Sequence, residues 1–549
     1  MKRFALLLTL LLALGLGMTA RAAVSGEFEY ELQANGTATI TGYTGPATIV
    51  TIPSYLKDAR VTGIANGAFY ASSITGIVIP NSVTYIGDYA FYWCENLTSV
   101  TLPSTISAIG YMTFEKCSAL TSIIIPDSVT TIGARAFTDC SALTSVTIPD
   151  SVTTIQHFAF DGCSSLASID LPDSVRTIGE SAFSSCSALT HVTLPKYLTT
   201  IEDSAFSSCY SLTSVTIPSS VKTIGDYAFS WCNLTSITIP DSVTSIGNWA
   251  FDLNHFLTSV TIPNPVTSIG DYAFNSCYSL SNITLPESLT TIGDRAFYRC
   301  NMSTIRLPNS LVNVGANPFM DCARLKTITV SDNHPVLEVV SGVLFDKNQK
   351  RLITYPLTRS GRTYAIPEGT RIIGDDAFMG CDLTRITIPD SVTTVGEGAF
   401  YSSYGFTNII LPNSVTSIGH YAFEYCTALA SITIPASVTS IGYSVFSECP
   451  ANITLFVDCG SYAERYAIDC GLNYLCGQSH DENNPKVSGD ADGDGTVDID
   501  DALAILEYCS GEGTSISTPA ADVNADGDVD LYDALLILQF EAGWNVTLS

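Results

Sequence analysis

Residues 143–155 read Leu-Thr-Ser-Val-Thr-Ile-Pro-Asp-Ser-Val-Thr-Thr-Ile, and this unit closes with Ala159-Phe160 and Cys163. Variants of the same unit fill the middle of the chain. The closing Phe recurs at positions 69, 91, 114, 137, 160, 183, 206, 229, 251, 274, 297 and 319, and again at 378, 400, 423 and 446. Within each block the spacing is 22 or 23 residues. Such a period is typical of solenoids, in which stacked units share one core because none can bury its apolar face alone.

Each unit predicts two short extended runs. Leu, Val and Ile alternate with Ser or Thr, which is the period of a half-buried strand, and Pro then ends the ladder. The second run, Ser-Val-Thr-Thr-Ile-Gly, ends at a glycine turn, and a brief helical turn carrying Ala-Phe and Cys is expected to close the coil. Residues 331–367 break the period, and two strand-like runs around 347–350 predict a hairpin that extends one coil.

The pattern Leu-x-x-Val-x-Ile-Pro-x-x-Val-x-x-Ile-Gly…Ala-Phe resembles the BspA-like leucine-rich repeat of bacterial surface proteins, over residues 64–450. The resemblance implies a β-rich α/β fold, a right-handed leucine-rich-repeat solenoid. Residues 23–63 are then expected to form an N-terminal cap and residues 451–477 a C-terminal cap. The polar stretch 478–488 is interpreted as a linker.

Seventeen cysteines are arranged in a way that argues against a disulfide framework. Thirteen of them follow a repeat Phe by three residues, at positions 94, 117, 140, 163, 186, 209, 232, 277, 300, 322, 381, 426 and 449. One thiol per unit in a constant register predicts a ladder of small buried side chains. Cys459, Cys470 and Cys476 lie outside the ladder, and one bridge among them is allowed.

Two acidic loops near the C-terminus predict calcium sites, one starting at Asp490 and one at Asp522. Each loop has Asp or Asn at positions 1, 3, 5, 9 and 12 and Gly at position 6, which suits the oxygen ligands and sharp turn of a calcium loop. Position 7 would supply a backbone carbonyl. The expected ligands of two Ca²⁺ ions are Asp490, Asp492, Asp494, Thr496, Asp498, Asp501, Asp522, Asn524, Asp526, Asp528, Asp530 and Asp533.

Each loop ends in Asp and is followed by a single apolar helix, and this duplicated arrangement over residues 489–549 resembles a type I dockerin. The resemblance implies a small all-α calcium-binding module with two loop-helix motifs, which docks onto a cohesin module of a scaffoldin in a cellulosome-like complex. The cohesin-binding residues that it implies are Ile499, Asp500, Leu506, Glu507, Leu531, Tyr532, Leu538 and Gln539. The two copies differ at loop positions 10 and 11, Ile499-Asp500 against Leu531-Tyr532, which places interchangeable two-way docking in doubt.

The N-terminal sequence and the net charge indicate where the protein acts and which partners it can have. A charged start, an apolar stretch from residue 4 to 18 and small residues near Ala22 predict a signal peptide over residues 1–22. No later segment has eighteen consecutive apolar residues, so no membrane span is expected. The net charge is −29, and residues 489–549 hold fourteen acidic and no basic residues, which argues against nucleic acid as a partner. We expect a secreted protein, attached to a cell-surface or free cellulosome-like complex.

The solenoid offers two candidate binding features. Tyr227, Trp249 and Tyr272 precede the repeat Phe by two residues on three consecutive units, and Trp231 lies near them. These rings are a candidate ligand strip for sugar rings or for a protein partner, with shielding of the core edge as the structural alternative. The Ser- and Thr-rich strand face, as in Thr144-Ser145, is a second candidate for polysaccharide, although β-branched Thr simply suits an exposed strand.

No catalytic constellation is apparent: the histidines are scattered, and no nucleophile motif or phosphate loop is present. The sequence favours a non-catalytic binding protein that displays the solenoid within a polysaccharide-degrading complex. The alternatives are a carbohydrate-active enzyme, an O-glycosyl hydrolase, and a cell-surface adhesin that binds mucin or matrix protein. Paired carboxylates for hydrolysis are not excluded by the sequence, because such partners meet only in space. If hydrolysis occurs, the break in the repeat is the first place to look, and it contains Asp332, His334, Glu338 and Asp346.

Overall fold

The computed structural model describes residues 21–477, 491, 497, 499–510, 521, 523, 529 and 531–541. Residues 1–20 of the predicted signal peptide and the predicted linker 478–488 lie outside the described residues. The chain divides into two compact units, Met1–Pro335 and Val336–Ser549.

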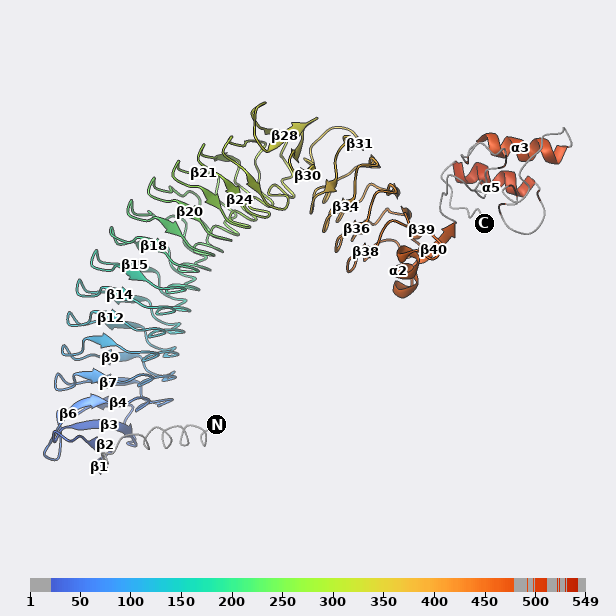
Figure 1. Ribbon diagram of the computed structural model, residues 1–549. Coiled ribbons are helices and arrows are strands. Elements are labelled where there is room, and N and C mark those ends of the chain that lie inside the picture. The colour runs from blue at the N-terminus through green and yellow to red at the C-terminus, as the bar shows by residue number, and fades with distance from the viewer. Residues whose placement is uncertain are drawn as a thin grey trace. The chain divides into compact units, whose positions relative to one another are not determined.

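The first unit is a parallel β-solenoid in which successive repeats stack in chain order (Figure 1). One strand of each repeat adds to a first ladder, and the register is constant, as in Ser122↔Ser145 and Ile123↔Val146. The central residue of these strands points into the core. The strands are β4 (Ile49–Thr51), β7 (Gly76–Val78), β9 (Ser99–Thr101), β11 (Ser122–Ile124), β13 (Ser145–Thr147), β15 (Ser168–Asp170), β17 (His191–Thr193), β21 (Ser259–Thr261), β23 (Asn282–Thr284), β25 (Thr304–Arg306) and β27 (Thr327–Thr329).

A second parallel ladder is built from the shorter extended run of each repeat, and its Ile residues are buried. Its strands are β8 (Tyr85–Ile86), β10 (Ala108–Ile109), β12 (Thr131–Ile132), β14 (Thr154–Ile155), β16 (Thr177–Ile178), β18 (Thr200–Ile201), β19 (Thr223–Ile224), β20 (Ser245–Ile246), β22 (Ser268–Ile269), β24 (Thr291–Ile292) and β26 (Asn313–Val314). The following Gly is required because the rungs nearly touch: a Cβ at Gly247 would lie 2.5 Å from Asp226 Oδ1 and 2.6 Å from the carbonyl carbon of Gly225.

The repeat phenylalanines form a stack through the core. Ring centroids of neighbouring units lie 5.1–5.8 Å apart from Phe69 to Phe319, and the planes are within 18° of parallel. Burying a Phe side chain contributes about 1.5–3 kcal/mol. Stacking these rings therefore couples each rung to the next.

The segment that closes each coil differs from the helical turn predicted from the sequence. It consists of successive tight turns, as in Ala136 N–H to Gly133 O and Cys140 N–H to Phe137 O. Non-glycine residues adopt left-handed φ two residues before and two residues after most repeat Phe, as at Arg135 (φ 56°) and Asp139 (φ 57°). A left-handed conformation is unfavourable for such residues, and the inter-rung bond from Phe137 N–H to Ala159 O (2.8 Å) shows what holds the chain there.

The N-terminal end carries a mixed sheet. Strand β1 (Arg21–Ser25) pairs antiparallel with β2 (Phe28–Leu32), which pairs antiparallel with β3 (Ala38–Tyr43). Strand β6 (Ala59–Ile64) then pairs parallel with β3 and antiparallel with β5 (Tyr55–Leu56). This sheet supplies partners for the backbone groups at the first edge of the solenoid.

The second unit starts with an antiparallel three-stranded meander at the break in the repeat. Strand β28 (Leu337–Val340) pairs with β29 (Val343–Asp346), which pairs with β30 (Arg351–Thr354) across the 347–350 connection where we predicted a hairpin. Parallel rungs then resume: β31 (Thr363–Ala365), β32 (Ile372–Ile373), β33 (Arg385–Thr387), β34 (Thr394–Val395), β35 (Asn408–Ile410), β36 (Ser417–Ile418), β37 (Ser431–Ile434) and β38 (Ser440–Ile441).

The last rungs are closed by β39 (Thr454–Asp458), α2 (Tyr462–Cys470) and β40 (Asn473–Gly477). Ser461 caps α2 by accepting the Glu464 N–H, and Gly471 ends it with a left-handed φ of 66°. A disulfide joins Cys459 to Cys476, which identifies the pair among Cys459, Cys470 and Cys476. Beyond the cap, helices α3 (Ile499–Ser510) and α5 (Leu531–Glu541) pack together around a small core of their own.

Candidate functional sites

Both acidic loops close in the same way at their last position. The N–H of Ala491 donates to Oδ1 of Asp501 at 2.7 Å, and the N–H of Val523 donates to Oδ1 of Asp533 at 3.0 Å. Each bond joins loop position 2 to loop position 12, and both carboxylates are buried. Burial of a carboxylate is costly unless the group is paired or coordinates a metal. A buried position-12 carboxylate with one oxygen oriented by a backbone N–H therefore fits the role of a calcium ligand in each loop.

The other ten predicted ligands lie outside the described residues. They are Asp490, Asp492, Asp494, Thr496, Asp498, Asp522, Asn524, Asp526, Asp528 and Asp530. The twelve-residue ligand set stays a prediction. Within the described residues, no group of three or more His, Cys, Asp or Glu side chains is arranged to hold a metal.

Helices α3 and α5 are copies that share one core. Ala502 and Ile505 of α3 and the equivalent Ala534 and Ile537 of α5 are buried in it. The opposite surface keeps apolar side chains: Leu503 and its equivalent Leu535 are both exposed. Sequence reasoning missed this pair, although the 32-residue offset between the copies gives them equivalent positions.

The predicted cohesin-binding residues occupy these two helices. Leu531 at the start of α5 is 64% exposed, and Leu506 in α3 is also exposed, whereas its counterpart Leu538 is partly buried against the small core. Ile499, Asp500, Glu507, Tyr532 and Gln539 lie in α3 or α5, but their side chains are outside the described part of the structure. The two copies therefore differ in the exposure of this leucine as well as in their residues at loop positions 10 and 11.

Three of the four residues of the predicted ligand strip stack on one another, and the fourth, Trp231, does not join them. Tyr227 stacks on Trp249 with centroids 5.8 Å apart and planes 4° from parallel, and Trp249 stacks on Tyr272 at 4.0 Å. The far face of Tyr272 meets the Arg295 guanidinium, 5.7 Å from its centroid. Trp231 contacts Tyr210 edge-to-face instead. Because the ring faces of Trp249 and Tyr272 cover one another, they are closed to a sugar ring, and the arrangement favours shielding of the core edge.

The threonine hydroxyls of the strand face are engaged within the solenoid. Oγ1 of Thr144 donates to the carbonyl of Thr121 at 3.0 Å, and Oγ1 of Thr258 donates to that of Thr235 at 3.4 Å. Thr153, on the second ladder, makes the same bond to Thr130. These hydroxyl protons join successive rungs, so the repeated Thr is explained by the fold.

The ladder cysteines are hydrogen-bond donors. Twelve of the thirteen thiols donate to the carbonyl of the repeat Phe in the preceding unit, with Sγ···O distances of 3.0–3.3 Å. Three units have another residue at this position, Ser72, Asn254 and Ser403, and two of these make the same bond: Asn254 to Phe229 and Ser403 to Phe378. We predicted only a packing role, because the acceptor is a backbone atom that the sequence does not reveal.

Burial raises the pKa of the ladder thiols. The pKa of Cys381 and Cys449 is raised to about 11, and that of Cys94 and Cys232 to about 12. A protonated buried thiol is neither a nucleophile nor a metal ligand. Among the described residues, the exposed cysteines outside the disulfide are Cys470 and Cys509.

The break in the repeat does not assemble a pair of catalytic carboxylates. His334 is buried, with Nε2 3.0 Å from the carbonyl oxygen of Pro308. Oδ1 of Asp346 accepts the N–H groups of Asn348 and Gln349 and so shapes the connection between β29 and β30. Asp332 is exposed, and Glu338 lies opposite Phe345 in the strand register.

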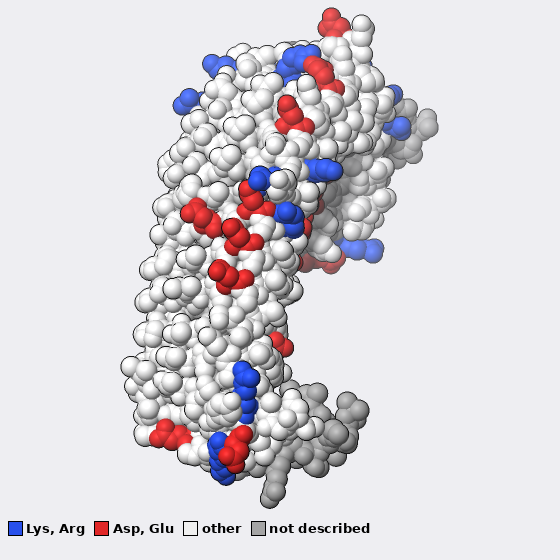
Figure 2. Space-filling model, turned by 90° about the vertical axis from the view of Figure 1, so that its left-hand side faces the viewer, with Lys and Arg blue, Asp and Glu red and all other residues white. Residues whose placement is uncertain are grey.

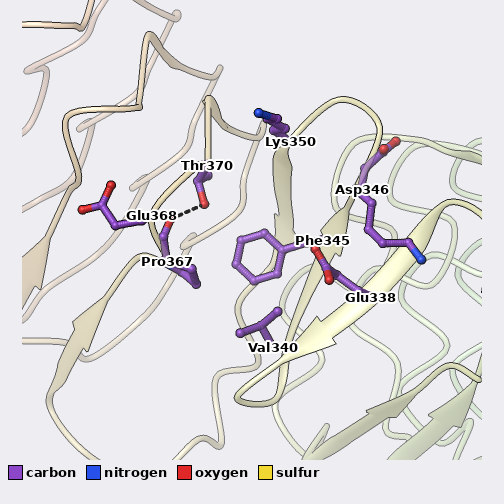
Figure 3. Close-up of a pocket in the computed structure, with 10 residues that line it drawn as sticks. Glu338, Val340, Phe345, Asp346, Lys350, Pro367, Glu368 and Thr370 are labelled. Carbon is purple, nitrogen blue, oxygen red and sulfur yellow. Dashed lines mark hydrogen bonds between the residues drawn. The ribbon is translucent and has the colours of Figure 1, made fainter. Parts of the chain in front are cut away.

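A small pocket of about 230 Å³ lies beside Glu338 and Phe345 (Figure 3). The Phe345 ring separates Asp346 from Glu368, and those two carboxylates point away from the ring in different directions. Thr370 Oγ1 donates to the Pro367 carbonyl at 2.7 Å. Glycoside hydrolysis needs two carboxyl groups on either side of one bond, and Asp346 and Glu368 do not face each other across this pocket.

One buried carboxyl outside the break has a pKa near neutrality. Burial raises the pKa of Asp252 to about 6, against hydrogen bonds from Asn275 and Ser230 that lower it. Those bonds, at 2.7 and 3.1 Å, hold both oxygens between neighbouring rungs. The group therefore acts as a structural link.

Charged side chains are sparse and of mixed sign on the face drawn in Figure 2. Most of that face is uncharged, and it has no broad basic area that would attract a polyanion. Among the described helices, none is both long and apolar enough to cross a bilayer.

A stacked parallel β-solenoid joined to two copies of a loop-helix motif with buried terminal aspartates defines a leucine-rich-repeat protein that carries a calcium-binding docking module. The family models agree with this class. The BspA type leucine rich repeat region matches over residues 62–149, 130–256, 253–360 and 357–464, and the chain belongs to that family. The dockerin type I domain matches residues 488–540. Such a domain binds calcium and implies a cohesin partner.

Several solved structures are similar to the chain. One is a leucine-rich repeat protein from Bacteroides ovatus ATCC 8483, with 26% identity, 83% of this chain and 100% of that chain covered, and a TM-score of 0.37. Another is a leucine rich cell surface protein from Faecalibacterium prausnitzii A2-165, with 26% identity, 82% and 98% covered, and a TM-score of 0.34. The pneumococcal vaccine antigen PcpA is 16% identical, with 84% and 100% covered and a TM-score of 0.34. The comparison with curated proteins gave no match.

Proposed function

We propose that this protein is a secreted, non-catalytic binding component of a polysaccharide-degrading, cellulosome-like complex. Its dockerin docks with two Ca²⁺ ions onto a cohesin of a scaffoldin, and the solenoid presents a binding surface. The observation that carries the proposal is the pair of equivalent bonds, Ala491 to Asp501 and Val523 to Asp533. Two copies of one calcium-loop closure on one small core support docking as the function of this end of the chain.

The non-catalytic role is supported by the hydrogen bonds that the candidate catalytic groups make within the fold. His334 and Asp346 bind backbone atoms, and both oxygens of Asp252 bond to neighbouring rungs. These contacts account for His334, Asp346 and Asp252 without a catalytic role. In this proposal, the dockerin attaches the protein to the complex, and the solenoid binds the ligand.

The test is capture of the full chain on an immobilised cohesin panel, with calcium or with a chelator. We expect capture with calcium and release by the chelator, because a module this small needs the metal to fold. The solenoid should keep its β-sheet circular dichroism in both conditions. Capture that survives the chelator would contradict calcium-dependent docking. Sugar release from insoluble plant polysaccharides would contradict the non-catalytic role.

A further inference from the structure

Five aromatic side chains gather in the first repeats of the solenoid, and we name them the N-terminal aromatic cluster: Tyr70, Tyr89, Tyr92, Trp93 and Tyr111. Tyr92 lies at the centre. It stacks on Tyr70 at 5.4 Å and meets Tyr89 and Trp93 edge-on at 6.1 Å each. Tyr111 extends the cluster through an edge contact with Tyr89 at 5.2 Å.

The backbone holds these rings in fixed positions. Tyr89 and Trp93 occupy the two left-handed positions around Phe91, with φ of 59° and 62°. Their N–H groups donate to the carbonyls of Tyr111 and Glu115 in the next unit, at 3.0 and 2.8 Å. A ring mounted on such a turn loses little conformational freedom when it binds a ligand, which favours affinity.

The N-terminal aromatic cluster differs from the Tyr227–Trp249–Tyr272 stack in the ring surface that it leaves exposed. Tyr70 is 51% exposed and Trp93 is 43% exposed, and Tyr89 is exposed as well. Most of its rings meet edge to face, so they do not cover one another as Trp249 and Tyr272 do. The Nζ of Lys116 on the following unit lies over the Trp93 ring, 5.1 Å from its centroid, and covers one face of it, whereas the preceding unit has only the small Ala71 at the turn position of Trp93.

Polar groups border the cluster. Trp93 Nε1 donates to Glu95 Oε1 at 2.5 Å, which fixes the indole edge. Glu115 lies on the next rung, is 5% exposed, and its Oε2 has no hydrogen-bond partner within the described part of the chain. Desolvation raises its pKa. A buried acceptor without a partner is costly, but this oxygen is closed to solvent, so Glu95 is the carboxylate that a ligand hydroxyl can reach.

We propose that the N-terminal aromatic cluster binds an uncharged polysaccharide, with pyranose rings on Tyr70 and Trp93 and a sugar hydroxyl donating to Glu95. Pyranoses have apolar C–H faces and hydroxyl edges, which match aromatic rings bordered by carboxylates. The border carries Glu95 and Glu115 but also Lys116, so it does not select for a strongly charged chain. The inference names the ligand of the solenoid and in that respect rests on the proposed function.

The experiment uses the full chain in affinity gel electrophoresis against hydroxyethylcellulose, xylan and glucomannan, with polygalacturonate as a charged comparison. Trp93→Ala is compared with Trp231→Ala, because Trp231 has the same turn position and is 46% exposed. We expect retardation by at least one uncharged polymer. Trp93→Ala should weaken this binding at least tenfold, Tyr70→Ala should act in the same direction, and Trp231→Ala should leave it unchanged.

Glu95→Gln tests the exposed carboxylate beside Trp93 with little change of shape, and a several-fold loss is expected. Equal circular dichroism of all variants establishes that they fold. Binding to none of the uncharged polymers, to polygalacturonate alone or only to a protein such as mucin would overturn the inference, as would equal effects of Trp93→Ala and Trp231→Ala. Cohesin capture of the same variants is measured separately, so failure of glycan binding is distinguishable from failure of docking.

Discussion

The side-chain amide of Asn254 donates to the carbonyl oxygen of Phe229 at 2.8 Å, and this is the bond that a cysteine thiol makes in the neighbouring rungs. Ser403 does the same with Phe378 at 2.9 Å. The position three residues after the repeat Phe therefore requires a small buried donor, for which Cys is one solution. The preceding rung supplies the acceptor, so the bond also fixes the stacking of units.

Cys209→Ser should preserve the solenoid, because the hydroxyl can donate to the Phe183 carbonyl as Sγ now does at 3.3 Å. Cys209→Ala removes the donor and should cost about 1–3 kcal/mol. The urea midpoint followed by far-UV circular dichroism measures both. An equal loss in the two variants would show that packing of sulfur, and not the hydrogen bond, determines the residue.

Solenoid stability should fall as the pH rises above about 8.5, the ordinary pKa of a free thiol. Burial raises the folded-state pKa of Cys381 and Cys449 to about 11, so between these values the unfolded state releases protons that the folded state keeps. Each ladder thiol then lowers the free energy of unfolding by about 1.4 kcal/mol per pH unit, and below pH 8.5 its contribution is constant. Urea midpoints at pH 7, 8.5 and 10 measure the effect. A variant with Ser at 163, 186 and 209 should show a shallower fall, and an unchanged slope would contradict this cause.

Asp501→Asn should lower the calcium stoichiometry from two to one. The amide oxygen can still accept the Ala491 N–H, but the negative charge that a calcium loop needs at position 12 is lost. Asp533→Asn should do the same in the second loop, and the double variant should leave α3 and α5 unfolded with calcium present. Isothermal titration calorimetry of the full chain gives the number of ions. Two ions at full affinity in Asp501→Asn would contradict the assigned ligand.

Leu531→Asp with Tyr532→Asp should weaken cohesin binding at least tenfold, because Leu531 presents 64% of its surface at the start of α5. The matched change in the first copy is Ile499→Asp, which should have little effect if docking uses the second copy alone. Surface plasmon resonance against one cohesin measures both, with the calcium stoichiometry as the control for folding. Unchanged affinity in the second-copy variant would contradict this contact.

The periodic part of the fold was predictable because each unit repeats the same local pattern. A Phe every 22 or 23 residues and alternation around Val146 indicated stacked parallel rungs, which the structure contains. The hairpin at 347–350 followed from two apolar runs with polar residues between them. Strand β28 was not predicted, because Leu337–Val340 lacks the alternation that marks a half-buried strand.

The candidate sites were predicted less completely, because side-chain orientation depends on neighbours that are remote in sequence. The spacing of Tyr227, Trp249 and Tyr272 correctly indicated three adjacent rings, but their mutual coverage is a property of the stacked rungs. The N-terminal aromatic cluster was missed because its rings come from four different register positions in successive units. The turn that replaces the expected helical turn depends on inter-rung bonds such as Phe137 N–H to Ala159 O.

The direction of the thiol-to-carbonyl hydrogen bond has a consequence for the folding of the solenoid. Twelve of the thirteen ladder thiols reach back to a carbonyl about 26 residues earlier in the chain, as Cys186 does to Phe160. If the predicted signal peptide directs export from the N-terminus, the surface on which each new coil packs emerges before that coil. A ladder thiol would then be open to oxidants only until its own coil packs, whereas refolding of the whole denatured chain exposes all seventeen cysteines at once.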